Sequence, residues 1–491
     1  MSQHRRTRRE FLTTTAAAGS LAVLAPEEVF ALLQNGIFVR PNLNSLNANS
    51  PDIVAYKAGI NAMKALPASN PLSWNTWANI HGSPSGTGAL WNTCQHGHWW
   101  FLPWHRLYLL FFERIIRKLS NQPTFALPFW DYSAGTAVGN VYPARAIPLI
   151  FRSPTVNNAL FVSQRNAGIN AGQQLAASAT SHATAFTFTN FTGPTGSATS
   201  FGSQMVAAPN HGAQPHGRLE SSPHDSVHGS IGGFMGSFGT AARDPIFWMH
   251  HSNIDRLWNL WLTLGGGRAD PNNSTWCNRI FSFFNENGVQ INIRVRDVIN
   301  ALAQTKVRYQ GEPTIPTQSC PPLIVQPPAV PSIPVLDILP RTLMLNEQAM
   351  TLGATPTTMS MRMPAANVRE RARTAITAAN RTLVLRMEGI QVDNHPGIIY
   401  EVYVGLAPGQ KPDPASKQFV GTLSTFGADH AHGEGLTAAW PIDAAAAAAL
   451  QGNADTVSVT FVPRGLFVGE REQPIQLQGR VRFKRMRVIE E

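Results

Sequence analysis

Cysteine is scarce in this chain of 491 residues, which has only three: Cys94, Cys277 and Cys320. Three cysteines exclude a disulfide scaffold, so a hydrophobic core must hold the fold together. Cys277 and Cys320 either pair with each other or stay as two buried thiols. Long apolar runs are also absent, because no segment reaches about 18 unbroken apolar residues, the length that a spanning helix needs. The sequence therefore predicts no insertion into a membrane.

Charge is sparse too, at 14% of the residues, and it lacks the pattern of a nucleic-acid-binding protein. The formal net charge is +10, but four arginines among the first ten residues, opposed by Glu10, supply +3 of it. The rest is spread out, apart from the terminal run RVRFKRMR, and no basic stripe alternates with aromatic residues. We therefore expect no nucleic-acid partner.

The amino terminus, residues 1–36, has the layout of a twin-arginine export signal. It contains TRREFL, followed by the small and apolar run TTTAAAGSLAVLA. A disordered basic tail is the alternative, and the cleavage point stays open. Because that pathway carries folded proteins, we expect the protein in the periplasm or outside the cell. The whole length suits two or three domains of about 150 residues each.

Four histidines gather in residues 219–258. His224 and His228 stand four positions apart, so on a helix both side chains lie on one face, about 5 to 6 Å apart. A single pair of this kind more often belongs to a polar surface than to a metal site. A glycine-rich turn then leads to a second helix, which can bring a third imidazole, from His250 or His251.

A second group of histidines lies upstream and strengthens the metal interpretation. A short predicted helix at residues 74–80 delivers His81 at its end, and His105 lies in the first turn of a helix that begins at Pro103. His96, nine residues earlier, must reach the same point from the preceding loop. Two groups of three imidazoles without carboxylate clusters suit copper, zinc or nickel. A paired copper site fits better than a carboxylate-bridged di-iron or dizinc site.

Two long segments carry a family resemblance. HWWFLPWHRLYLLFFER and DPIFWMHHSNIDRLW resemble the two signature segments of the tyrosinase and polyphenol oxidase family, the type 3 copper proteins. The resemblance covers residues 50–310 strongly and residues 381–489 moderately. It implies a mainly α catalytic core at residues 40–310, a four-helix bundle that holds two copper ions and uses O2 as co-substrate.

The resemblance implies three histidine ligands for each copper ion: His81, His96 and His105 for the first, and His224, His228 and His251 for the second. His251 is preferred to His250 because the family's third ligand stands four residues before a helix Asp, here Asp255. His98 is then left over.

Cys94 stands two residues before His96. This C-x-H pattern resembles that of fungal tyrosinases and molluscan haemocyanins, in which the cysteine forms a thioether to the histidine ring. The resemblance therefore implies a Cys94–His96 thioether. An ordinary buried thiol is the alternative.

Three further residues resemble groups around the family's copper site. Glu220 matches a carboxylate that holds a water in relatives, and it is the candidate to assist deprotonation of the substrate together with Asp225. Many tyrosinases carry Asn and many plant enzymes Gly where this chain has Asp225, so the strength of monophenol hydroxylation rests on that residue. Phe247 resembles an aromatic residue that shapes the cavity, although plain core packing explains it nearly as well.

The remaining regions predict a surface segment, a connector and a second domain. Residues 163–208 are expected to form a long surface excursion, and three histidines in or beside it are expected to face solvent: His182, His211 and His216. Residues 311–380 are expected to form a proline-rich connector. Alternating runs then predict an all-β sandwich at residues 381–491, with one helical insert at residues 443–450. Three histidines of this domain are interpreted as surface residues, with copper delivery by the last two as the alternative: His395, His430 and His432.

The resulting hypothesis is a tyrosinase that hydroxylates monophenols and oxidises o-diphenols to o-quinones, acting on small phenolic substrates. The resemblance also implies a latent form, in which the C-terminal domain covers the active site. A catechol oxidase limited to o-diphenols is the alternative within this class. A haemocyanin-like oxygen carrier with the same six ligands is the alternative from another class. A copper chaperone is a candidate partner, and the oligomeric state stays open.

Overall fold

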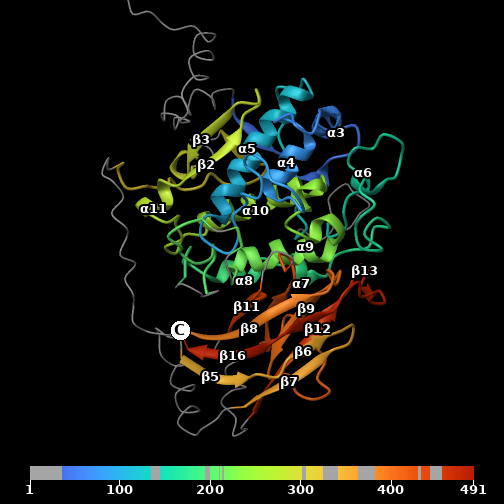
Figure 1. The fold of residues 1–491 in the computed structure, drawn as a ribbon, viewed down its shortest axis with the longest axis vertical. Helices are drawn as coiled ribbons and strands as arrows, with labels where there is room; N and C mark the ends of the chain where they lie inside the picture. The colour runs from blue at the N-terminus through green and yellow to red at the C-terminus, as the bar shows by residue number, and fades with distance from the viewer. Residues whose placement is uncertain are drawn as a thin grey trace, which may run out of the picture.

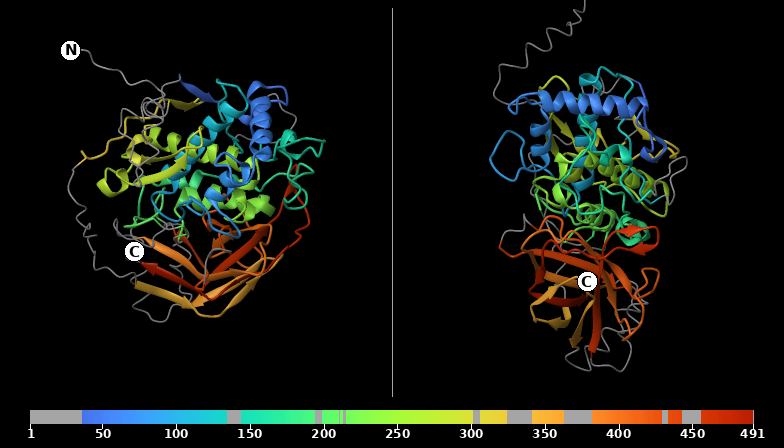
Figure 2. Two further views of the ribbon diagram at one scale, coloured as in Figure 1. Left: turned by 45° about the horizontal axis from the view of Figure 1, so that its top comes forward. Right: turned by 90° about the vertical axis from the view of Figure 1, so that its right-hand side faces the viewer.

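The computed structural model describes residues 36–133, 144–193, 199–209, 211–212, 215–300, 306–323, 341–362, 382–428, 433–442 and 456–490. Described residues 36–323 form a helical body and described residues 341–490 form a β body, and the two bodies lie against each other (Figure 1 and Figure 2). Residues 1–35 of the expected export signal, His430, His432 and the expected helix at residues 443–450 lie outside the described residues. None of the described helices is long and apolar enough to cross a membrane.

In the described chain, five helices frame the helical body: α3 (Pro51–Ala65), α4 (Trp74–His81), α5 (Phe101–Leu119), α9 (Ser226–Ile231) and α10 (Ile246–Thr263). The predicted helix at residues 74–80 is confirmed, and the helix expected from Pro103 begins two residues earlier. Arginine and lysine in the last turn of α5 oppose the negative end of its dipole. The mainly helical core is thus confirmed, whereas the four-helix bundle stays a prediction.

Two contacts hold α5 against α10 in the middle of this body. The rings of Phe112 and Trp248 stack with their centroids 3.4 Å apart. The buried Arg106 Nε donates a hydrogen bond to Asp255 Oδ1 at 2.6 Å. Because an ion pair buried in this way has a fixed geometry, it sets which faces of the two helices meet. These faces carry the histidines described below.

Shorter elements complete the helical body: α6 (Leu149–Arg152), α7 (Ala177–Thr180), α8 (Ala183–Thr187), α11 (Ser274–Cys277), the parallel pair β1 (Phe38–Arg40) and β4 (Val307–Tyr309), and the hairpin of β2 (Ile280–Phe284) and β3 (Gln290–Arg294). Cys277 and Cys320 form a disulfide, which decides between the two alternatives left open by the sequence. This bond ties the start of the proline-rich connector to the helical body.

Part of the segment predicted as a surface excursion lies inside the helical body. Phe201 is buried and stacks on Trp261 of α10, with ring centroids 4.2 Å apart. Ser203 is buried as well. The prediction was wrong for these residues because it rested on the small and polar composition of residues 163–208. Composition does not indicate which of these residues contact side chains far along the chain.

The β body contains ten described strands in one sheet: β5 (Arg341–Asn346), β6 (Met350–Leu352), β7 (Thr357–Arg362), β8 (Leu383–Val392), β9 (Ile399–Val404), β10 (Phe419–Leu423), β11 (Leu436–Ile442), β12 (Thr456–Arg464), β15 (Val481–Phe483) and β16 (Arg485–Glu490). The short hairpin of β13 (Phe467–Val468) and β14 (Arg471–Glu472) lies beside it. The sheet order is β10-β9-β12-β7-β5-β16-β8-β15-β6, and β11 pairs with β8.

The sheet is rolled around its own hydrophobic core. Trp440 Nε1 in β11 donates a hydrogen bond to Thr422 O in β10 at 3.0 Å, so strands from different ends of the sheet lie together. The predicted all-β domain is confirmed. Its strands connect as one ten-stranded sheet in which β5 and β7 are joined through a single residue pair, Leu345 and Arg362, and the sandwich stays a prediction. The sheet also begins at Arg341, so residues 341–362, which were predicted as connector, belong to it. The first strand of the sheet was not recognised from the sequence, because it follows a proline-rich stretch and because the strands at residues 341–362 are short and contain methionine.

Candidate metal centre

Three histidines meet from α4, α5 and the loop between them, and they are called the first set below. His81 ends α4, His105 lies in the second turn of α5, and His96 lies in the loop. Their ring centroids are 5.4 Å (His81–His96), 5.1 Å (His96–His105) and 5.7 Å (His81–His105) apart. All three are buried. The structure thus brings the three predicted residues together.

The second set consists of His224, His228 and His251. His224 precedes α9 and His228 lies inside it, and their ring centroids are 4.7 Å apart. His251 of α10 lies 4.9 Å from His224 and 5.4 Å from His228 by the same measure. The two sets meet where His251 stacks on His105, with ring centroids 4.4 Å apart. All six predicted ligands therefore lie in one buried cluster.

His250 also lies beside the second set, with its ring centroid 4.8 Å from that of His228. Its Nδ1 lies 3.2 Å from the Tyr132 hydroxyl. Among the described residues, His251 groups with His81 and His105 of the first set as well as with His224 and His228, with ligand atoms in each group within 4.8 Å of one another, whereas His250 groups with the second set alone. Contact with both sets thus favours His251 as the shared ligand. His98, left over by the sequence, is buried and accepts a hydrogen bond from Trp100 N at 3.3 Å.

The histidine rings are held through Nδ1, which donates to an acceptor in five cases: His81 to Phe238 O (3.0 Å), His96 to Glu220 (3.0 Å), His105 to Phe101 O (2.8 Å), His224 to Asp225 (2.8 Å) and His228 to Met235 O (2.8 Å). Hydrogen bonds of this kind fix the tautomer and orientation of metal-binding imidazoles. His251 differs, because its Nε2 lies 3.2 Å from His228 Nε2.

The opposite nitrogen atoms are suited to metal binding. Nε2 of His96, His105 and His224 is buried and has no hydrogen-bond partner among the described residues. Burial lowers the pKa of His105 to about 3, and burial also lowers the pKa of His96, His224, His228 and His251. The rings are therefore neutral at pH 7, which is the form that binds metal. An all-imidazole donor set of this kind fits copper.

Two carboxylates lie behind the rings. Glu220 Oε1 accepts from His96 Nδ1, and the same carboxylate accepts from Gly97 N (2.9 Å) and Ser203 Oγ (3.1 Å). Burial raises the pKa of Glu220 to about 7. Asp225 Oδ1 accepts from His224 Nδ1 and Asp225 Oδ2 accepts from His216 Nδ1 at 2.6 Å. Both carboxylates thus orient imidazoles, whereas their role toward a water stays a prediction.

His216 was predicted to face solvent, and this prediction was wrong. Its side chain is buried against Asp225 and lies 3.8 Å from Glu220 Oε1. Burial lowers the pKa of His216, but the carboxylates of Asp225 and Glu220 raise it more, to about 9. The flanking Gly, Gln and Pro residues suggested a surface loop. The spacing of His216 four residues before Glu220 is the signal that could have revealed it.

Cys94 lies beside the first set and is buried. Its Sγ falls within 4.8 Å of ligand atoms of His81 and His96, and lies 3.2 Å from His211 Nδ1. The thiol is therefore next to the ring that the predicted thioether would join, and the thioether itself stays a prediction. His211 is half-buried and in contact with Cys94, contrary to the expectation that it faces solvent. His182 is half-buried as well.

Aromatic rings cover both sides of the second set. Phe247 packs on His251, with ring centroids 4.1 Å apart, from within α10. On the opposite side Phe426, in the loop after β10 of the β body, stacks on His228 at 3.9 Å with 10° between the ring planes. Phe426 is buried and also lies 5.5 Å from His224. Sequence reasoning missed Phe426, because no local pattern distinguishes a ring that packs across a domain boundary.

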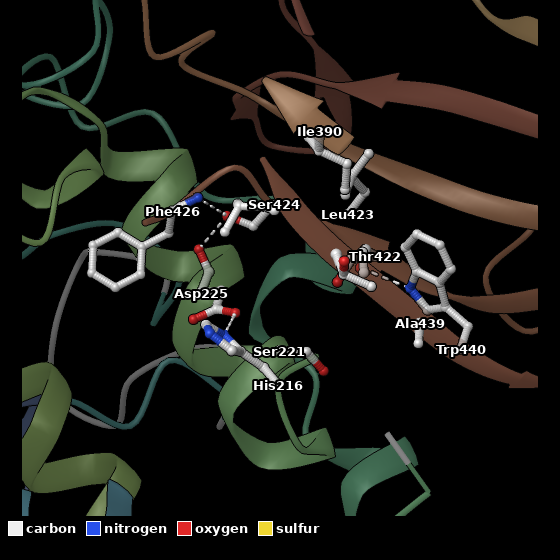
Figure 3. Close-up of a pocket in the computed structure, with 13 residues that line it drawn as sticks. His216, Ser221, Asp225, Ile390, Thr422, Leu423, Ser424, Phe426, Ala439 and Trp440 are labelled. Atoms are coloured by element: carbon white, nitrogen blue, oxygen red, sulfur yellow. Dashed lines mark hydrogen bonds and ion pairs between the residues drawn. The ribbon is translucent and has the colours of Figure 1, made fainter. Parts of the chain in front are cut away.

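The β body contacts the chain around His224 through polar groups as well. Ser424 Oγ donates to Asp225 O at 2.7 Å, and the hydroxyls of Thr422 and Ser226 are 2.8 Å apart. A cavity of about 30 Å³ lies between these contacts and is lined by residues of both bodies, among them His216 and Asp225 (Figure 3). This volume has room for one water molecule. His395 lies at the same interface, because a Cβ on Gly236 would come within 3.0 Å of its ring, so it is not a simple surface residue.

Two adjacent sets of buried, neutral imidazoles on a helical frame define a class of protein, one that holds a pair of metal ions through histidine. Residues 71–264 match the family described as the common central domain of tyrosinase. Residues 270–321 match the polyphenol oxidase middle domain, and residues 342–481 match a domain of unknown function, DUF7868. The chain belongs to the tyrosinase and polyphenol oxidase family.

Individual relatives agree with this assignment. A tyrosinase of Hahella sp. (strain CCB-MM4) is 35% identical over 320 residues, which cover 58% of this chain and 65% of the relative. A latent polyphenol oxidase of Prunus armeniaca is 31% identical over 278 residues, 53% of this chain and 46% of the relative. A chloroplastic polyphenol oxidase of Malus domestica is 28% identical over 417 residues, 80% of this chain and 69% of the relative. The chain thus spans less than two thirds of the length of the first two relatives.

Solved structures show a similar fold over almost the whole chain. The structure of latent apple tyrosinase aligns with a TM-score of 0.60 at 23% identity, covering 93% of this chain and 97% of that chain. A latent aurone synthase, a polyphenol oxidase, aligns with a TM-score of 0.57 at 22% identity, covering 92% and 89%. At this identity the likeness concerns the fold, and its coverage includes both bodies.

Proposed function

We propose that the protein is a copper-dependent phenol oxidase that uses O2 to hydroxylate monophenols at the ortho position and to oxidise o-diphenols to o-quinones. The observation that supports this most directly is the single buried cluster of six imidazoles in two sets. Bound copper would supply the binding and activation of dioxygen. The match to the tyrosinase central domain, residues 71–264, contains all six histidines.

The proposed ligands follow the geometry of the two sets. The first set would hold one copper ion and the second set the other, with His251 preferred to His250 because it contacts both sets. Phe247 packs against His251 and, with ring centroids 4.9 Å apart, against His81, and so excludes water from one side of the cluster. A dry site keeps the imidazoles neutral and ready to bind metal.

Glu220 is the proposed proton acceptor. A general base works best when its pKa is close to the working pH, and burial raises the pKa of Glu220 to about 7. The carboxylate lies beside His96, at the edge of the first set. Because its oxygens already accept hydrogen bonds from His96, Gly97 N and Ser203, it would take the phenolic proton through a water held beside it.

The β body is proposed to keep the enzyme latent. Phe426 stacks on His228 and occupies the side of the second set that faces the β body. The hydrogen bonds from Ser424 and Thr422 anchor the same loop region to the helical body. A phenol that approaches from this side must displace Phe426, so activity would require the β body to be released.

A catechol oxidase limited to o-diphenols is the second candidate, and one observation favours it. Both carboxylate oxygens of Asp225 accept hydrogen bonds from imidazoles, those of His216 and His224. In this arrangement Asp225 orients two rings, and it would give little help to Glu220 in the deprotonation of a monophenol. The two candidates therefore differ in whether monophenols react.

Cleavage between the two bodies tests both latency and substrate range. A protease site is inserted between residues 324 and 340, the chain is loaded with copper, and L-tyrosine and catechol are offered before and after cleavage. We expect little quinone before cleavage and quinone from both substrates afterwards, measured by absorbance. Quinone from catechol alone would support the second candidate. A copper-loaded, cleaved protein that turns over neither substrate would contradict the proposal, and the chain without the inserted site is the control for the protease.

A further inference from the structure

His216 belongs to neither histidine set, yet it contacts the carboxylates behind both. Its Nδ1 lies 2.6 Å from Asp225 Oδ2 and 3.8 Å from Glu220 Oε1. The residue is only 6% exposed, and a buried imidazole needs polar partners of this kind. Figure 3 shows the His216 ring directed at the Asp225 carboxylate.

The contacts of His216 continue to a proposed metal ligand. His216 Nδ1 donates to one oxygen of Asp225, and the other oxygen accepts from His224 Nδ1 at 2.8 Å. A carboxylate that accepts from two fixed imidazoles cannot rotate without losing one of these hydrogen bonds. The orientation of the His224 ring therefore depends on His216 as well as on Asp225.

The surroundings of Asp225 make this support necessary. The cavity between the two bodies is lined by both Asp225 and His216 and has room for a water molecule (Figure 3). A water there competes for the carboxylate, and without His216 it could draw Asp225 away from His224. The hydrogen bond from His216 keeps the carboxylate aimed at the ring.

The first set depends less on His216. The carboxylate behind His96 is that of Glu220, and Glu220 is already fixed by Gly97 N at 2.9 Å and by Ser203 Oγ at 3.1 Å. His216 Nδ1 lies 3.8 Å from Glu220 Oε1, beyond hydrogen-bond distance, and the ring centroids of His216 and His96 are 6.3 Å apart. Loss of His216 should therefore disturb the second set more than the first.

We propose that His216 is a positioning residue for the second metal ion: it fixes Asp225, and through Asp225 it holds the His224 imidazole in the orientation that binds metal. The inference rests on the proposed copper function and extends it to a residue outside the six ligands. Removing the partner bonded directly to a metal-binding histidine typically lowers metal affinity by about 10- to 100-fold. Because His216 acts one residue further out, through Asp225, the affinity of the second set for copper should fall by up to this factor.

Copper retention in the full-length chain tests the proposal without an activity assay. Wild type, His216→Phe and His216→Asn are loaded with copper and dialysed against a chelator at a concentration that leaves wild type with two ions per chain. We expect His216→Phe, which lacks a donor, to retain about one ion per chain. His216→Asn keeps an N–H donor at the position of Nδ1, the atom that bonds to Asp225, and should retain two. Thermal unfolding of the copper-free proteins checks that each variant folds, and His216→Leu replaces His216→Phe if the larger ring is not accommodated.

The Asp225→Ala background separates positioning from general packing. With the carboxylate removed, His216→Phe should cause less than a twofold further change in copper affinity, because His216 acts only through Asp225. Retention of both ions by His216→Phe would overturn the proposal. So would equal loss in the Phe and Asn variants, or a full additional loss in the Asp225→Ala background. Failure of the proposed oxidase activity would appear in wild type as absent turnover, and the copper counts of the variants would still decide this inference.

Discussion

The first and second histidine sets have the same chemistry but different surroundings. The groups that accept hydrogen bonds from Nδ1 in the first set belong to the helical body: Phe238 O, Glu220 and Phe101 O. The second set instead lies where the two bodies meet, with Phe426 stacked on His228 and Ser424 bonded to Asp225 O. The Phe426 ring centroid lies 3.9 Å from that of His228 but 6.1 Å from that of His96. Metal binding by the first set should therefore depend less on docking of the β body than metal binding by the second set.

Because of this difference, the β body can affect the second set directly. Two of its hydroxyl groups and the Phe426 ring contact the chain from Asp225 to His228, the turn that directly follows His224 and contains His228. Further hydrogen bonds between the bodies join Asn166 to Gly397 O and Arg218 to Ala439 O. Phe426 packs into the core of the helical body, whereas the β body has a core of its own that does not include Phe426, so the β body can be released as a folded unit. Regulation by release of a folded domain is compatible with such an interface.

Removing one ligand from each set gives the largest expected effects. His105→Ala and His228→Ala should each lose one copper ion and reduce catechol oxidation by the cleaved protein to background, because both ions act together. Only His228→Ala should also weaken docking, because Phe426 loses the ring on which it stacks. Copper analysis measures the first effect. The fraction of β body that co-elutes with the helical body after cleavage between residues 324 and 340 measures the second. Equal release in the two variants would show that the sets do not differ as described.

Phe426→Ala sharpens the comparison from the side of the β body. Truncation of a buried Phe costs about 3–5 kcal/mol, and here it also opens the side of the second set that faces the β body. We expect catechol turnover by the uncleaved chain to rise at least about tenfold, since release needs less free energy. Phe461→Ala, in β12 within the core of the β body, is the matched control.

The control variant should lower the thermal stability of the chain without raising turnover at temperatures where it remains folded. If Phe426→Ala leaves the uncleaved chain as inactive as before, Phe426 does not block the site. The β body would then act only through the polar contacts at its edge.

Much of the site could be predicted because its residues repeat local patterns. His224 and His228 stand four apart, and His105 lies at the start of a strongly amphipathic helix, so sequence spacing alone places them. The outcome for the fold is similar: α4 and α5 lie within a few residues of the predicted bounds. Local periodicity fixes elements of this kind regardless of what packs on them.

What could not be predicted depends on contacts between distant parts of the chain. The Thr422 and Ser226 hydroxyls pair across 196 residues, and Phe426 reaches His228 from another domain. His216 was placed on the surface because a Gly- and Pro-rich neighbourhood usually lies there. Only the folded arrangement shows that Asp225 accepts a hydrogen bond from it. The start of the β body at Arg341 was missed for a related reason, since short strands are recognised by their partners in the sheet more than by their own pattern.

Thr422→Val carries the smallest expected effect and tests the polar part of the interface alone. The variant removes the hydroxyl that pairs with Ser226 at 2.8 Å and keeps the shape of the side chain. Loss of one such hydrogen bond costs about 1 kcal/mol, so docking of the β body should weaken by roughly fivefold. The measurement is the urea concentration at which the uncleaved chain reaches half of the catechol turnover of the cleaved chain. This activation midpoint should be lower for the variant than for wild type.

Thr460→Val provides a closely matched comparison, because Thr460 is equally buried and its hydroxyl pairs with Thr358 at 2.9 Å inside the β body. This variant should destabilise the β body by a similar amount and leave the hydrogen bonds to the helical body unchanged. Its activation midpoint should therefore stay closer to that of wild type than the midpoint of Thr422→Val. Equal shifts in the two variants would mean that activation follows unfolding of the β body. Latency of the enzyme would then depend on the stability of that domain instead of on the contacts around His224 and His228.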